Sequence, residues 1–263
     1  MEALKSERDS TVSVRALEMV AQVRTGSLDA FGRAEQVALQ MEAAMGIGIL
    51  NDGERLPPEQ RLAQHLGVSP LTLRQSLAVL RSKGLVETRR GRGGGSYVHG
   101  TVSVSDADVK RMLRAHRTDD LRDLADTAGS IAASAARLAT LRSDSEDVRR
   151  VRELAKRFEV AKHPDDLRRA NSRLHIGLGV ASQSRRLTTL TIQLQTELSP
   201  MSWGEVWDEY RFAAAQHHDQ LISAIEKRDT ETAESIARGL FDEQGALLID
   251  QHLDLLTVEW EPA

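Results

Sequence analysis

The sequence predicts a mostly α-helical protein, with a small β-hairpin in its N-terminal part and an all-α bundle of six or seven helices in its C-terminal part. Three observations predict this class. Aromatic residues make up only 3% of the 263 residues, whereas strands favour aromatic and β-branched side chains. Apolar residues recur at the helical period along most of the chain. The strand-like segments lie between residues 85 and 99.

The chain is expected to have four parts. Residues 1–29 form a polar extension with one short helical pattern at residues 14–21. A first domain covers residues 30–100, a linker covers residues 101–115, and a helical domain covers residues 116–256.

The first domain is expected to begin with two helices. Residues 31–46 carry apolar side chains near a period of 3.6 and predict the first helix. Pro58 and Glu59 suit the first turn of the second helix, because proline has the right φ and a carboxylate favours the positive end of the helix dipole. Gly67 ends that helix.

A third helix and a hairpin follow. Ser69 suits the N-cap and Pro70 the first helical position, and Gly84 ends the helix. Its apolar positions are Leu73, Leu77 and Leu80. Residues 85–90 and 96–99 resemble two strands joined by the glycine-rich residues 91–95.

The second domain shows only helical periods. An alanine-rich run covers residues 131–141, and leucine stripes follow in residues 167–178 and 187–198. Trp203, Trp207 and Tyr210 are spaced as the start of a further helix. Short polar breaks separate these segments, as in a helical bundle.

Charge is distributed unevenly along the chain. The net charge is −4, but residues 54–99 carry +5 and the remainder carries −9. This asymmetry favours a basic module that binds a polyanion. A chance cluster of basic residues on a solvent-exposed face would give the same net charge.

Composition excludes several protein classes. There is no cysteine, so disulfide scaffolds and cysteine-based zinc sites are excluded. The N-terminal residues lack the apolar region of a signal peptide, and no apolar run reaches 18 residues. We therefore expect a cytoplasmic protein without a membrane partner.

Two helices joined by a tight turn, followed by a hairpin, are typical of a winged helix-turn-helix. The helix after Ser69 would enter the major groove of double-stranded DNA, and the turn at Gly67 would fix its angle. The hairpin tip would carry arginines to the phosphates or the minor groove, and its glycines would let the backbone approach closely.

Residues 54–98 resemble the GntR family of bacterial transcription regulators over nearly the whole signature of that family. The helical region that follows resembles the FadR branch, whose effector domain is an all-helical bundle. The resemblance implies a homodimer that binds operator DNA. It also implies DNA contacts from the residues Arg61, Ser69, Leu71, Thr72, Arg74, Arg89, Arg90, Gly91 and Arg92.

Two positions depart from the family pattern, namely Gln60 and Pro70, where arginine is frequent in the family. The operator sequence therefore should not be copied from relatives. Two of the contacts have simpler alternatives. Arg74 could pair with Glu59 on the surface, and Leu71 could either touch a thymine methyl group or cover the core.

Many members of the FadR branch hold a divalent metal through one Asp and three His, with the Asp four residues before the first His. The resemblance places Asn171, His175, His218 and Leu240 at these positions. A carboxylate and an imidazole are missing, so a metal site is expected to be weak or absent. The alternatives are a polar effector pocket formed by the same four residues and satisfied polar groups in the core. His217 is expected to point away.

The class of effector is less defined. Thr127, Ser130 and Ser134 stand on the helix where the family has Arg and Glu. These small side chains leave room for a fatty-acyl ligand, while the family favours a carboxylate. Trp203, Trp207 and Tyr210 could line such a pocket or simply pack the helices.

The preferred hypothesis is a non-enzymatic, effector-responsive repressor of transcription. One alternative is a constitutive dimeric DNA-binding regulator with a degenerate effector site. Another is a metal-dependent hydrolase using His175, His217 and His218, which lacks a carboxylate base and a nucleophile motif.

Overall fold

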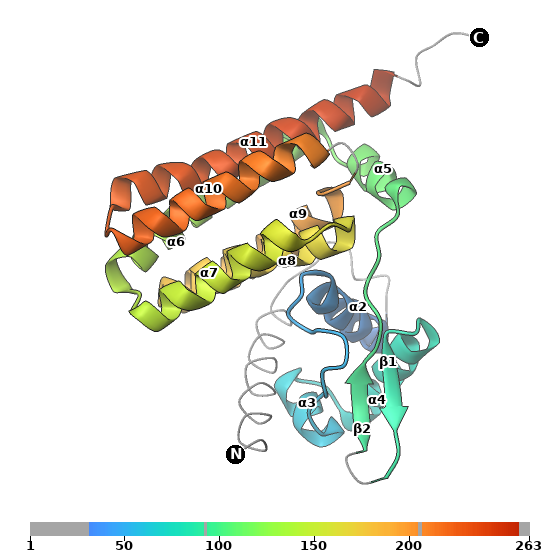
Figure 1. The fold of residues 1–263 in the computed structure, drawn as a ribbon. Coiled ribbons are helices and arrows are strands. Elements are labelled where there is room, and N and C mark those ends of the chain that lie inside the picture. Colours follow the sequence, from blue (N-terminus) through green and yellow to red (C-terminus); the bar gives the residue numbers. More distant parts are fainter. Residues whose placement is uncertain (1–31, 92–93, 205–206, 258–263) are drawn as a thin grey trace, which may run out of the picture. The chain divides into compact units, whose positions relative to one another are not determined.

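The computed structural model describes residues 32–91, 94–204 and 207–257, and it divides into two compact units, Met1–Ser103 and Val104–Ala263. Figure 1 shows the fold of the chain. The described residues are mostly helical with one two-stranded sheet, which confirms the predicted fold class. The predicted helix at residues 14–21 lies outside the described residues.

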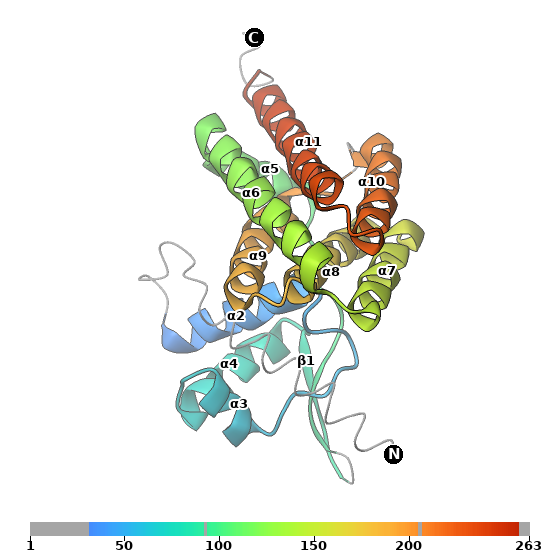
Figure 2. The same cartoon turned by 90° about the vertical axis from the view of Figure 1, so that its left-hand side faces the viewer.

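The first unit contains three helices and a hairpin in the predicted order. Helix α3 packs against α4, as Figure 2 shows, and α2 packs against the same helix. The elements are α2 (Arg33–Gly46), α3 (Glu59–His65), α4 (Pro70–Ser82), β1 (Val86–Arg89) and β2 (Gly95–Val98).

Local signals place both ends of α4. The backbone N–H of Thr72 donates to Ser69 Oγ at 3.0 Å, so Ser69 is the N-cap that the sequence predicts. Gly67 and Gly84 have φ values of 63° and 71°, a left-handed conformation that glycine adopts without strain and that ends a helix. The three predicted apolar positions of α4 are fully buried.

The hairpin is extended on one side by the segment before α3. Strands β1 and β2 are antiparallel, with Val86 opposite Val98 and Arg89 opposite Gly95. The backbone N–H of Leu56 donates to the Ser96 carbonyl at 2.9 Å, so this segment braces β2 along its free edge.

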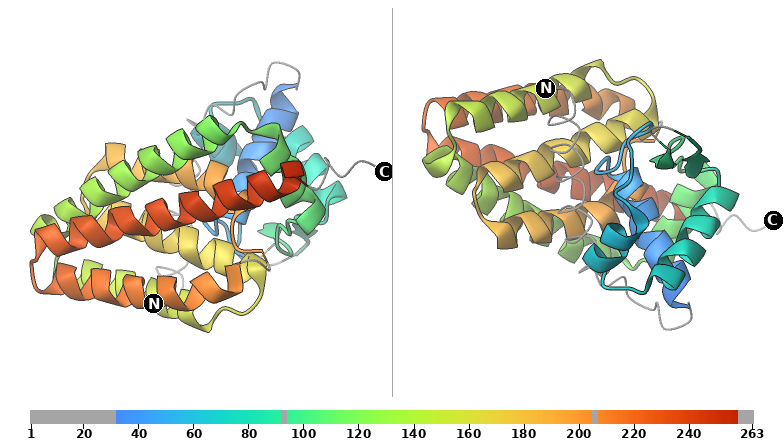
Figure 3. Two further views of the ribbon diagram at one scale, coloured as in Figure 1. Left: turned by 90° about the horizontal axis from the view of Figure 1, so that it is seen from above. Right: turned by 90° about the horizontal axis from the view of Figure 1, so that it is seen from below.

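The second unit contains seven α-helices and one short 3-10 helix in its described part, and the number of α-helices is within the predicted range. Helices α6 and α11 run side by side, as Figure 3 shows. Helices α8, α9 and α10 pack against α6, and α7 packs against α8 and α10. The elements are α5 (Asp106–Ala115), α6 (Thr118–Arg142), α7 (Ser145–Val160), α8 (Pro164–Ala181), α9 (Arg185–Leu198), the short 3-10 helix η2 (Ser199–Met201), α10 (Asp208–Glu226) and α11 (Thr230–Thr257).

Residues 101–115, which the sequence analysis assigned to a linker, contain helix α5. Ser105 Oγ accepts the backbone N–H of Asp108 at 3.2 Å and caps this helix. Val109 and Leu113 are buried on its inner face, so the helix is held by packing onto the bundle. The polar composition of the segment concealed these two contacts.

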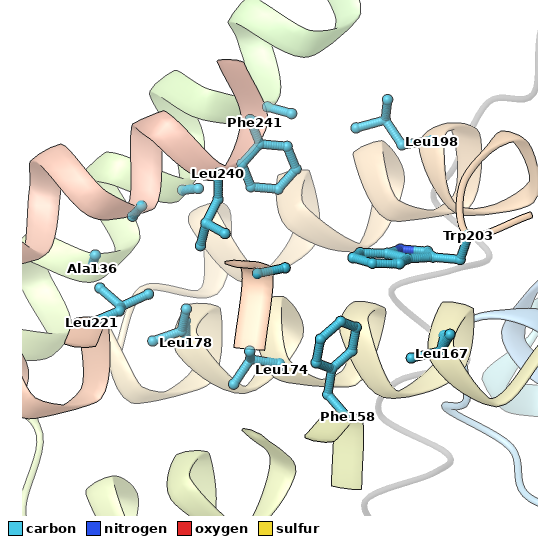
Figure 4. Close-up of a cluster of buried hydrophobic side chains, with 14 of the residues drawn as sticks. Ala136, Phe158, Leu167, Leu174, Leu178, Leu198, Trp203, Leu221, Leu240 and Phe241 are labelled. Carbon is cyan, nitrogen blue, oxygen red and sulfur yellow. The ribbon is translucent and has the colours of Figure 1, made fainter. Parts of the chain in front are cut away.

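The tryptophans before α10 do not begin a helix, so this sequence interpretation was wrong. Helix α10 begins at Asp208, and Trp203 has a left-handed φ of 64° in the turn after η2. Both Trp203 and Trp207 are buried in the core. The ring of Trp203 meets that of Phe158 edge to face, with centroids 4.9 Å apart (Figure 4).

A buried ion pair lies at the start of α8. Arg168 Nη1 donates to Asp165 Oδ1 at 2.5 Å, and the two residues are only 3% and 5% exposed. Arg168 Nε also donates to the Ser202 carbonyl at 2.7 Å, and the Val104 N–H donates to Asp165 Oδ1 at 3.3 Å. These bonds satisfy two charges that are buried in the helical unit.

Candidate DNA-binding surface and bundle cavity

Helix α4 presents a polar, accessible face opposite its buried leucines. Leu71 is 65% exposed, so it does not cover the core. Thr72 Oγ1 lies 2.8 Å from Ser69 Oγ, and Arg74 Nε donates to Glu59 Oε2 at 2.9 Å. Arg74 therefore makes the surface ion pair that the sequence allowed, and both partners remain accessible to a ligand.

The arginines of the hairpin differ in the contacts that their side chains make. The Arg89 guanidinium lies over the Tyr97 ring, 4.1 Å from its centroid, and pairs with Glu87 at 2.5 Å. Arg90 is exposed and makes no ion pair within the described part of the chain. Arg92 lies outside the described residues. The family pattern implies that Arg90 enters the minor groove and that Arg89 contacts phosphates; of these two arginines, Arg90 has the uncommitted charge.

The hairpin tip is fixed by backbone contacts that sequence reasoning missed. Arg55 Nη2 donates to the Gly94 carbonyl at 2.6 Å, and the Gly94 N–H donates to the Gly91 carbonyl at 2.8 Å. A Cβ atom at Gly94 would lie 2.8 Å from the Arg89 carbonyl oxygen and 2.9 Å from that of Gly91. The tip therefore requires glycine at this position for steric reasons.

The four bundle residues that the sequence grouped together are all buried. They are Asn171, His175, His218 and Leu240. The rings of His175 and His218 are 5.9 Å apart between centroids. The neighbouring His217 points elsewhere, with its Nδ1 3.6 Å from Glu243 Oε2.

Burial makes both core histidines neutral near pH 7. It lowers the pKa of His175 from 6.5 to about 4. Burial also lowers the pKa of His218 well below 6.5, and the nearby His175 and His217 lower it further. Within the described residues, neither His175 Nδ1 nor either ring nitrogen of His218 has a hydrogen-bond partner. Such buried, unpaired nitrogens are uncommon in proteins and point to a ligand or water.

A small cavity of about 10 Å³, which has room for about one water molecule, lies among α6, α8, α9 and α11. Of the four grouped residues only His175 lines it; His218, Asn171 and Leu240 lie elsewhere in the core. The lining residues are Ala128, Ile131, Ala132, Ala135, His175, Leu178, Thr191, Leu194, Gln195 and Phe241.

The wall on α6 was assigned to the wrong residues from the sequence. Thr127, Ser130 and Ser134 are exposed, whereas Ala128, Ala132 and Ala135 line the cavity. The alanine-rich run was a usable signal, because alanines leave space where helices pack. Trp203, Trp207 and Tyr210 do not line this cavity and pack against one another instead.

The donor set does not fit the metal site that the family resemblance implies. Asn171 offers an amide where a carboxylate would be needed, and Leu240 offers no donor atom. Across the described ranges no group of three or more His, Asp or Glu side chains is placed to hold a metal ion. The hydrolase alternative depends on His175, His217 and His218, of which His217 has a carboxylate neighbour, Glu243, and points away from the other two.

No helix in the described segments is both long and apolar enough to cross a membrane.

Comparisons with known proteins match both units. Residues 33–95 match the bacterial regulatory proteins of the gntR family, and residues 123–243 match the FCD domain. An HTH-type transcriptional regulator of Mycobacterium gastri, RmpR, is 35% identical over 247 residues, which is 90% of this chain and 88% of that protein. The Uxu operon transcriptional regulator of Escherichia coli is 30% identical over 190 residues, covering 70% of this chain and 74% of that protein.

Among solved structures, McbR/YncC of E. coli covers 84% of this chain and 98% of its own, with 19% identity and a TM-score of 0.47. The winged helix-turn-helix and the relatives together define the chain as a DNA-binding transcription regulator. It belongs to the gntR family of bacterial regulatory proteins and carries an FCD domain after its DNA-binding unit.

Proposed function

We propose that the chain is a cytoplasmic, homodimeric repressor of the FadR branch, which binds operator DNA and responds to a small-molecule effector in its helical unit. The observation that carries this proposal is that one chain combines an exposed recognition helix with a bundle cavity that reaches a buried, unpaired imidazole. Binding of an effector would favour one arrangement of the bundle and so change the affinity for DNA.

Helix α4 is the element proposed to enter the major groove, since the second helix of the motif does so in this class. Leu71 and Thr72 lie in its first turn and would face base edges. Arg74 would exchange Glu59 for a phosphate or a guanine edge, and Arg90 would reach the phosphates from the hairpin. Arg89 would act mainly by holding Tyr97, because its charge is already paired.

A homodimer is proposed because one winged helix-turn-helix makes too few contacts for useful specificity. Two copies related by a twofold axis would read two half-sites of a near-palindromic operator. Sedimentation at micromolar concentration is expected to give twice the mass of the 29.0 kDa chain.

The double variant Arg74→Ala/Arg90→Ala is expected to bind operator DNA about 100-fold more weakly, because each arginine contact contributes roughly 1–3 kcal/mol. The measurement is a gel shift with the DNA upstream of the protein's own gene at one fixed salt concentration. Each lost phosphate contact should also lower the salt dependence by about 0.9 in the log–log slope.

The matched control is Arg122→Ala/Arg137→Ala, which removes two exposed positive charges from α6 in the helical unit. It is expected to bind DNA like the wild type. Equal DNA affinity of both double variants would refute the proposed contacts.

A constitutive dimeric regulator is the second candidate. The observation that favours it is that Asn171 and Leu240 occupy two of the four positions implied for an effector-holding metal. It predicts that no small molecule changes DNA affinity, which gel shifts with and without candidate metabolites test directly.

A further inference from the structure

We propose that Arg55 is a positioning residue for DNA binding. It holds the hairpin tip from the neighbouring segment, residues 53–56, so that Arg90 stays directed at the DNA, and it makes no DNA contact of its own. The inference rests on the DNA-binding role proposed above and assigns part of that role to a residue outside α4 and the hairpin.

The hairpin tip needs a support of its own, because the hairpin is short and rich in glycine at this end. Strands β1 and β2 have four residues each, and the pair nearest the tip is Arg89 and Gly95. Two strands alone are marginally stable, and glycine loses more conformational freedom on ordering than any other residue. Arg90 lies beyond this last pair and next to Gly91, so strand pairing does not hold it.

The backbone of the segment before α3 supports β2 only in the part away from the tip. The Val98 N–H donates to the Glu54 carbonyl at 2.9 Å, and the Leu56 N–H donates to the Ser96 carbonyl at 2.9 Å. Pro57 follows and has no N–H to donate, so the backbone contact ends there. Support closer to the tip therefore comes from a side chain of this segment.

The Arg55 side chain gives that support. Its Nη2 donates to the Gly94 carbonyl at 2.6 Å, two residues beyond Ser96 toward the tip. A Cβ atom at Gly95 would lie 3.2 Å from Arg55 Nε, so the guanidinium lies against the bare backbone of that glycine. A hydrogen bond from a charged donor is stronger than one between neutral groups, which suits it to hold an exposed loop.

Gly94 links this bond to Arg90. Its N–H donates to the Gly91 carbonyl at 2.8 Å, while its carbonyl accepts from Arg55. Both backbone polar groups of Gly94 are therefore bonded, one of them to the residue that follows Arg90. Without the Arg55 bond the turn can open, the Arg90 side chain spreads over more positions, and ordering it on DNA costs more entropy.

The DNA-binding test must separate positioning from a direct contact, because Arg55 is exposed. Arg55→Met removes the charge and the donor but keeps most of the length of the side chain. It is expected to weaken binding to the DNA upstream of the protein's own gene about fivefold, in a gel shift at one fixed salt concentration. In the Arg90→Ala background the same change should weaken binding less than about twofold, because a residue that acts through Arg90 loses its effect when Arg90 is absent.

The matched control is Arg33→Met, which removes an exposed arginine at the start of α2 in the same unit. The Arg33 side chain bonds only within its own helix in the described structure, to Gln36 at 3.3 Å. This control is expected to bind DNA like the wild type.

Amide hydrogen exchange of the full chain with isotope-labelled glycine measures the tip directly. In Arg55→Met the Gly94 amide is expected to exchange at least about tenfold faster than in the wild type, because its local structure opens more often. The Gly53 amide donates to the Val98 carbonyl at 3.0 Å, away from the tip, and is expected to keep its wild-type rate.

Four results would each overturn the inference. Equal loss of protection at Gly53 and Gly94 would give Arg55 a role in the stability of the whole unit, and an unchanged rate at Gly94 would mean that Arg55 does not hold the tip. The same loss of DNA affinity with and without Arg90 would make Arg55 a direct DNA contact. Unchanged DNA affinity in Arg55→Met would show that the tip needs no support. In all four cases the DNA contact proposed for Arg90 stands, since that contact is tested by Arg90→Ala alone.

Discussion

The variant Asp165→Leu will lower the free energy of unfolding of the helical unit by about 3–5 kcal/mol, because it leaves the Arg168 guanidinium buried without its counterion. Both residues are almost fully buried, and their side chains are 2.5 Å apart. Burial lowers the pKa of Arg168, and the carboxylate of Asp165 opposes that effect. Urea unfolding followed by circular dichroism measures the change.

The adjacent ion pair provides the matched control. Asp166 pairs with Arg169 at 2.5 Å with the same spacing, but the Asp166 side chain is 56% exposed. Asp166→Leu is therefore expected to cost less than about 1 kcal/mol. The double variant Asp165→Leu/Arg168→Met should recover much of the loss, since an apolar pair can replace a buried ion pair. Similar losses for the two single variants would show that burial does not matter here.

Acidification from pH 7 to pH 4 will destabilise the helical unit by about 3 kcal/mol through His175 alone. The folded protein holds the pKa of His175 at about 4, below its ordinary value of 6.5. The unfolded chain therefore binds a proton first as the pH falls. The stability contributed by neutral His175 is complete above pH 6.5 and is lost progressively down to about pH 4. His218, with its pKa lowered in the same direction, increases the loss.

Urea unfolding at a series of pH values between 7 and 4 measures this loss. The double variant His175→Leu/His218→Leu should be much less sensitive to pH in this window. His99→Ala is the control, because that histidine is exposed and belongs to the first unit, so it should leave the pH dependence of the helical unit intact. An unchanged pH dependence in the double variant would mean that other groups control acid unfolding.

Elements defined by local signals were predicted well from the sequence. Helix α4 begins after Ser69 and ends before Gly84, because an N-cap and a left-handed glycine act within a few residues. The same reasoning failed for Trp203 and Trp207. Their spacing matches a helix, but it also suits a turn that places two large rings into one core.

The residues that line the cavity could not be predicted from local sequence patterns. Its walls come from residues 128–135, 175–178, 191–195 and Phe241, which only tertiary packing brings together. The sequence analysis grouped Asn171, His175, His218 and Leu240 from a family pattern and thereby placed His175 at the cavity. It could not show which neighbours face the same space, since that depends on the rotation of each helix about its axis.

The hairpin tip sets a limit for anyone who redesigns this regulator toward a new operator. In a library that varies the tip, most members with another residue in place of Gly94 would be lost. A Cβ atom at this position would clash with two carbonyl oxygens. Arg90 and the exposed positions of α4 can be varied freely by comparison, since their side chains extend into solvent. Variation is therefore best concentrated on the exposed positions of α4 and on Arg90, with Gly94 kept unchanged.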